Sequence, residues 1–120
     1  MSTKIIDWLD KPRRMTIDLQ SEMMLEKMLG KGLQQASTEM IGPTLLVTVL
    51  YCGLARHDSG LSFREARELA QNALNSKRIS GLDFQNQMME MLVGSASFSG
   101  FRNEDEDGEP VPLLESSTND

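Results

Sequence analysis

The sequence predicts a mainly α-helical protein: a small four-helix domain with a short N-terminal β-strand and an acidic C-terminal tail. Apolar residues recur at helical spacing along much of the chain, and residues suited to helix capping precede several of these stretches. Acidic residues crowd the C-terminal end, which has few apolar groups, so we expect that end to be disordered when free. The expected organisation is an N-terminal segment (1–12), a helical domain (13–101) and a tail (102–120).

The predicted strand comes directly before the first predicted helix. Side chains alternate between polar and apolar over Arg13–Leu19, which indicates a short strand, with a helix entry as the alternative. Asp18 is suited to cap the N-terminus of a first helix and Gly30 to end it. Leu33–Met40 is either a further helical turn or a loop, and the pattern does not decide between them.

The second predicted helix is apolar on almost every side. Pro43 suits its first position, and the apolar character continues until Arg56 and His57 end it. A helix of this kind that is too short for a membrane should form the buried centre of the domain. A buried strand is the alternative, because Val47 and Val49 are β-branched.

Two more helices follow, each with a recognisable start. Ser62 and Glu65 form a capping-box pattern, and Ser80 stands at the N-cap position of the fourth helix. The third helix has one apolar face, formed by Phe63, Ala66, Leu69, Ala70, Ala73 and Leu74. The apolar residues of the fourth helix cover half its circumference or more, which is wider than one small core needs.

The charge of the chain is unevenly distributed. The 12 Lys and Arg residues and 18 Asp and Glu residues give a net charge of −6. Seven of the acids and none of the basic residues fall in 103–120, so the remaining 12 basic and 11 acidic residues give the body about +1. This balance argues against a general nucleic-acid binder. The longest apolar run, Leu45–Ala55, is too short for a membrane span, and we expect a soluble intracellular protein.

The residues needed for catalysis or metal binding are scarce. Cys52 is the only cysteine and His57 the only histidine, so an internal disulfide and the common zinc motifs are excluded. These two residues lie on different sides of a helix, and we predict a core thiol and a helix-terminal histidine. Residues 103–108 resemble the start of an EF-hand loop, but Leu114 replaces its final Glu. We therefore expect no enzyme, no cofactor and no specific metal site.

Two smaller features have both a structural and a functional interpretation. Lys11, Arg13 and Arg14 form a basic cluster that is either solvated surface or a contact for an acidic partner. Trp8 either packs the N-terminal segment against the domain or anchors an interface.

The nine methionines suggest a binding surface. Methionine side chains are flexible and adapt to varied apolar partners. We hypothesise that Met23 and part of the Met88–Met91 face line an exposed apolar groove. The alternatives are gap-filling in the core and a surface for self-association into a homo-oligomer. The expected partner-binding residues are Met23, Met24, Met28, Phe84, Met88, Met89, Met91 and Leu92.

Three stretches resemble tail assembly chaperones of long-tailed bacteriophages and related gene-transfer agents. They are Leu25–Leu33 (LEKMLGKGL), Leu50–His57 (LYCGLARH) and Leu61–Ala66 (LSFREA), within a similarity that covers about residues 13–93. The resemblance implies a small, helical, non-enzymatic protein. It would bind the long apolar tape measure protein in the host cytoplasm, help to recruit tail tube subunits, and leave before the virion is complete.

A small acidic phage-encoded regulator or inhibitor of a host target is the alternative function. That protein would use its acidic tail for recognition, so its binding should weaken steeply with salt. A chaperone that binds through apolar surface should tolerate salt.

Overall fold

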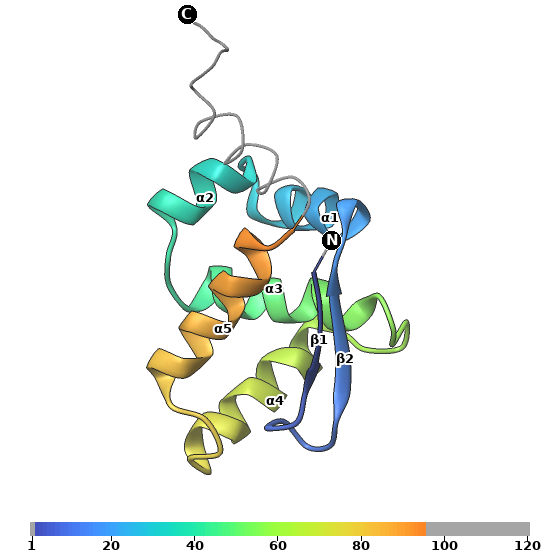
Figure 1. Ribbon diagram of the computed structural model, residues 1–120, viewed down its shortest axis with the longest axis vertical. Helices are drawn as coiled ribbons and strands as arrows, with labels where there is room; N and C mark the ends of the chain where they lie inside the picture. Colours follow the sequence, from blue (N-terminus) through green and yellow to red (C-terminus); the bar gives the residue numbers. More distant parts are fainter. Residues whose placement is uncertain (1, 96–120) are drawn as a thin grey trace, which may run out of the picture.

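The computed structural model describes residues 2–95, which form a two-stranded antiparallel sheet and five helices (Figure 1). The mainly helical fold with a short N-terminal strand is confirmed, but the predicted helix count of four is wrong. The predicted tail at 102–120 lies outside the described residues. The elements are β1 Ser2–Ile6, β2 Arg13–Ile17, α1 Leu19–Leu29, α2 Leu33–Glu39, α3 Pro43–Ala55, α4 Phe63–Asn75 and α5 Gly81–Val93.

The N-terminal segment belongs to the sheet instead of standing apart from the domain. β1 pairs with β2 in a register that places Ser2 opposite Ile17 and Ile6 opposite Arg13. The alternating stretch at 13–17 therefore forms the predicted strand, with β1 as its partner. Leu19 does not continue that strand: it begins α1 and is 66% exposed.

The additional helix is α2, which forms over the stretch where the sequence allowed either a helical turn or a loop. α1 ends at Gly30, whose φ of 73° is the left-handed conformation that glycine adopts easily. Three residues later, the Glu26 carboxylate accepts a hydrogen bond of 2.9 Å from the Leu33 backbone N–H. Leu33 and Ala36 are both buried, so this short helix is held by packing on one side.

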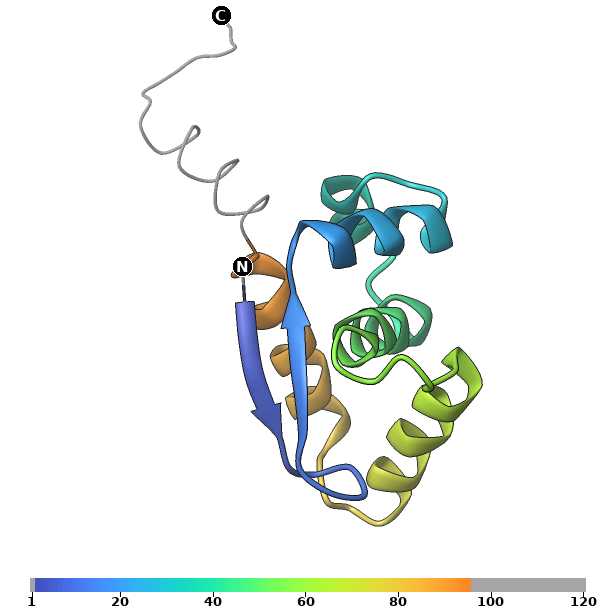
Figure 2. The ribbon, with the colours of Figure 1, turned by 90° about the vertical axis from the view of Figure 1, so that its right-hand side faces the viewer.

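Helix α3 is the buried centre of the domain, as its apolar sequence predicted. It contacts β2, α1, α4 and α5 (Figure 2). Val49 and Leu50 are fully buried, and Gly53 faces the side chains of Met15 and Ile17 on β2. The absence of a side chain at Gly53 allows the helix to approach the sheet closely.

The predicted starts of the last two helices are confirmed. Ser62 and Glu65 form both hydrogen bonds of the capping box at α4, and the Ser80 side chain accepts from the Asp83 N–H at α5. Both helices pack against α3, and α5 also contacts both strands of the sheet. α3 thus supports α4 on one side and α5 on another.

Candidate functional site

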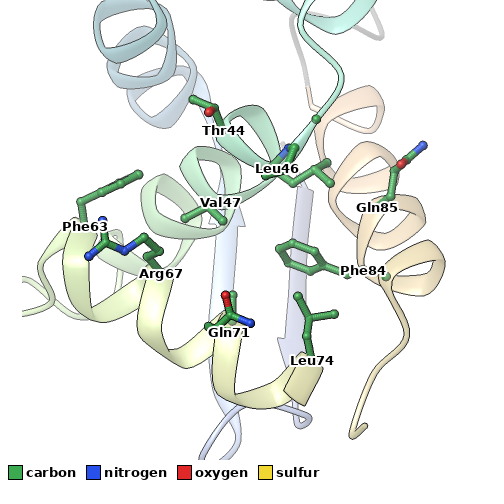
Figure 3. Close-up of a pocket in the computed structure, with 13 residues that line it drawn as sticks. Thr44, Leu46, Val47, Phe63, Arg67, Gln71, Leu74, Phe84 and Gln85 are labelled. Carbon is green, nitrogen blue, oxygen red and sulfur yellow. The ribbon is translucent and has the colours of Figure 1, made fainter. Parts of the chain in front are cut away.

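A groove lies where α4 and α5 meet the N-terminal half of α3, with a volume of about 720 Å³ (Figure 3). The side chains of Leu46 and Val47 on α3 lie between the two other helices. Leu74 on α4 and Phe84 on α5 point toward each other across it (Figure 3). The lining residues are Gly42, Pro43, Thr44, Leu46, Val47, Phe63, Arg67, Ala70, Gln71, Leu74, Gly81, Phe84 and Gln85.

The arrangement of residue sizes on α4 explains why the groove stays open. The small residues Ala66, Ala70 and Ala73 are buried, which lets α4 lie close to the core. The larger Phe63 and Leu74, on the same apolar face, are only half-buried and line the groove. The sequence predicted this apolar face, but not that its larger residues would remain accessible.

Trp8 braces the α5 wall of the groove from behind. Its ring stacks edge-to-face on Phe84 with centroids 5.7 Å apart, and its indole N–H donates a 2.9 Å hydrogen bond to Gln87 Oε1. The Arg78 guanidinium donates a 3.0 Å hydrogen bond to the Trp8 carbonyl. Trp8 is buried, so the packing interpretation of this residue holds and the indole is not an exposed anchor.

An aromatic pair also supports the α4 wall. Phe63 packs edge-to-face on Tyr51 of α3, with ring centroids 5.7 Å apart. Such pairs add to the stabilisation that burial alone provides and fix the orientation of each ring. The two aromatic side chains that line the groove, Phe63 and Phe84, are therefore both held from outside it.

The groove carries a positive charge at its rim. Among residues 2–95, Arg67 is the one charged residue that lines it. The N-terminus of α3 at Gly42 also borders the groove, has no side-chain cap and carries the positive end of the helix dipole. The amides of Gln71 and Gln85 complete the polar rim.

The structure separates the predicted partner-binding residues into two groups that do not form one groove. On α5, the predicted exposed apolar face is buried: Phe84, Met88, Met91 and Leu92 pack into the core, and Met89 is half-buried. Their burial corrects the expectation of a shared exposed face. The extra apolar width of α5 has a structural cause, because this helix packs against both α3 and the sheet. Phe84 is the only member of the predicted set that also lines the groove.

The predicted α1 residues lie elsewhere. Met23 and Met28 are 63% and 43% exposed, whereas Met24 is half-buried against the core. None of these three lines the groove. The groove residue that the sequence analysis missed most clearly is Val47, whose helix was predicted to form the buried centre of the domain. Pro43 and Thr44, both exposed, mark where that helix leaves the core.

Cys52 and His57 make separate contacts. The Cys52 thiol lies 3.8 Å from the Met28 sulfur, and burial raises the pKa of this thiol to about 12. His57 Nε2 lies 2.7 Å from Thr16 Oγ1. A thiol that stays protonated is a poor nucleophile. Within residues 2–95, no three His, Cys, Asp or Glu side chains are grouped so that they hold a metal ion.

The predicted basic cluster is partly neutralised by local carboxylates. Arg13 forms two hydrogen bonds to Asp10, at 2.8 and 2.9 Å, and a third to Asp58 at 3.1 Å. The Arg13 hydrogen bonds lower the pKa of Asp10 to about 2. These contacts tie the hairpin to the loop after α3, which assigns Arg13 a structural role.

Comparison of the chain with protein-family models, with characterised proteins and with solved structures gave no match. The five helices of residues 2–95 all lack the combination of length and apolar character needed to cross a bilayer. The EF-hand-like stretch at 103–108 lies outside the described residues.

Proposed function

We propose that this protein is a non-catalytic assembly chaperone that holds an apolar helical segment of a tape measure protein in the α3–α4–α5 groove. It would also help to recruit tail tube subunits. The observation that carries the proposal is the groove, whose centre is apolar and whose walls are held in place by aromatic contacts. An amphipathic helix binds a protein by laying its apolar face into a groove of this kind.

The identity of the client comes from the resemblance of residues 13–93 to tail assembly chaperones. A long helical client offers many amphipathic segments, and each segment exposes apolar surface until the client is packed. A groove lined by Val47, Leu74 and the two phenylalanines recognises apolar shape, and therefore accepts different segments. The half-buried state of Val47 and Leu74 leaves apolar area for a client to cover.

Substitution of Leu74 by serine tests the groove. The binding partners are overlapping tryptophan-free peptides that cover the tape measure protein encoded in the same genome. Binding is followed by the emission of Trp8, the only tryptophan, which packs on Phe84 of the groove wall. We expect Leu74→Ser to weaken binding about tenfold, because a leucine contact contributes about 1.5 kcal/mol when fully buried.

Leu82→Ser is the matched control, since Leu82 is 68% exposed and does not line the groove. It should bind peptides as the unmodified chain does. Thermal unfolding of each variant confirms that it remains folded. Equal weakening by both variants, or weakening by Met23→Ser alone, would place the client outside the groove. Binding that disappears at high salt would favour the regulator of a host target instead.

A further inference from the structure

We infer that Arg67 makes the groove selective for amphipathic helices that carry a carboxylate beside their apolar stripe. The inference rests on the proposed function, because it specifies the chemistry of the segment that the groove accepts. It concerns the charge of the client, which the resemblance to tail assembly chaperones leaves open.

The charge of the groove comes from one side chain. Of the 13 residues in the described part of the chain that line it, Arg67 alone is charged and none is a carboxylate. Arg67 forms no ion pair or hydrogen bond with residues 2–95. Its guanidinium therefore has all its donors available to an incoming acceptor.

Helix α4 itself supplies no partner for Arg67. Side chains three and four positions away are within reach on a helix surface, and for Arg67 these are Phe63, Arg64, Ala70 and Gln71. Arg64 on the same helix differs, because Glu68 stands four positions on and accepts its hydrogen bond at 3.3 Å. The carboxylate that matches Arg67 must come from another segment.

The position of Arg67 brings it beside a helix that binds in the groove. Arg67 lies beside Phe63 toward one end of the groove, whereas Leu74 and Phe84 face each other toward the other end (Figure 3). A helix whose apolar residues lie against Leu74 and Phe84 therefore extends past Arg67. The positive end of the α3 dipole has the same sign and borders the same groove. An acidic residue next to the apolar stripe satisfies both features, and a lysine there is repelled.

Three designed helical peptides test this inference. They share one leucine stripe, lack tryptophan, and carry Glu, Gln or Lys at one position beside the stripe. With the full-length protein, we expect the Glu peptide to bind best and the Lys peptide worst. The total difference should be about three- to tenfold, because an exposed ion pair contributes only modestly. Calorimetry and Trp8 emission both report the affinity.

The charge-reversal variant Arg67→Glu should invert the order, so that the Lys peptide binds best. Lys27→Glu is the matched control: it makes a charge reversal of the same sign at an exposed residue of α1 that does not line the groove, and it leaves the neighbours of Arg67 unchanged. It should keep the original order. An unchanged order in Arg67→Glu, or an equal inversion in Lys27→Glu, would overturn the inference.

The outcomes also separate this inference from the proposed function. If all three peptides bind equally and Leu74→Ser still weakens them, the groove binds helices without charge selection. If neither these peptides nor tape measure segments bind, the proposed function fails.

Two other occupants of the groove would also overturn the inference. If a second copy of the chain occupied the groove, the NMR signals of the groove residues would change with protein concentration. If the chain's own residues 111–114 occupied it, the double substitution Leu113→Ser/Leu114→Ser would change the methyl signals of Val47 and Leu74.

Discussion

At the scale of single residues, the core determines the chemistry of Cys52. The residue lies on α3, whose flanks are covered by α1 and the sheet, and its thiol contacts the Met28 sulfur. Loss of hydration disfavours the thiolate, which raises the pKa of Cys52 to about 12. Met28 itself remains 43% exposed, so its sulfur lies at the boundary between core and solvent.

The folded protein should therefore resist thiol labelling. At about pH 8, where an ordinary exposed cysteine is substantially ionised, we expect Ellman's reagent to leave Cys52 unmodified in the native state. In guanidinium chloride, one thiol per chain should react.

Ser59→Cys supplies the control, because Ser59 lies in an exposed loop. Its native state should release one equivalent of chromophore and its unfolded state two. Fast labelling of the unmodified native protein would show that α3 is more accessible than the packing around Cys52 indicates.

At the scale of elements, the contact between α3 and β2 depends on Gly53. A Cβ atom at this position would lie 2.8 Å from Met15 Cε, closer still to Met15 Cγ, and 3.3 Å from Ile17 Cδ1. Met15 and Ile17 are fully buried, so neither side chain has free space to move into. The glycine thus sets the distance between the central helix and the sheet.

Gly53→Ala should therefore destabilise the fold. Overpacking typically costs about 1–3 kcal/mol, and the better helix propensity of alanine offsets about 1 kcal/mol of this. Because two atoms of Met15 would lie less than 3 Å from the added Cβ, the cost falls at the upper end of that range. We expect a net loss of about 2 kcal/mol in the free energy of unfolding, measured by urea titration with Trp8 emission.

Gly81→Ala is the matched control at the first position of α5, where an added Cβ meets nothing within 4 Å. Its stability should be equal to or slightly above that of the unmodified chain. If Gly53→Ala behaved in the same way, the sheet would not be seated on α3 as tightly as the structure places it.

At the scale of the whole molecule, one ion pair links the start of α1 to the end of α3. Arg56 donates hydrogen bonds of 2.8–3.1 Å to both carboxylate oxygens of Asp18, which also caps α1 by accepting from the Ser21 N–H. The Arg56 bonds are the main cause that holds the pKa of Asp18 well below its usual range, and the bonds from Ser21 add to it.

The sign of the pH dependence follows from this lowered pKa. A depressed folded-state pKa gives stability that is present above the unfolded pKa of about 4 and is lost as the pH falls toward the folded value. The unmodified chain should thus lose stability on acidification below about pH 4. Asp18→Asn should be less stable by about 1 kcal/mol at neutral pH and should lose less on acidification.

Asparagine caps helices nearly as well as aspartate, so this change isolates the ion pair from the cap. Asp7→Asn is the control, since Asp7 is exposed and makes no ion pair within residues 2–95. It should retain the neutral stability of the unmodified chain. If the free energy of unfolding fell with pH by the same amount in Asp18→Asn and in the unmodified chain, Asp18 would not contribute to acid sensitivity.

The sequence by itself determined the features that depend on neighbours along the chain. The Asp18 and Ser62 caps, the Gly30 stop, the strand at 13–17 and the apolar α3 all follow from local rules of capping and periodicity. These rules act over a few residues, so a single sequence carries them in full.

Tertiary structure decided the features that depend on distant partners. β1 is a strand because β2 lies beside it and pairs with it. α2 is a helix because Leu33 and Ala36 are buried against the core. The Met88–Met91 face is buried because α5 meets the sheet as well as α3, a neighbour that helical periodicity cannot specify. The groove arises for the same reason, since which apolar side chains remain uncovered depends on how α4 and α5 lie against α3.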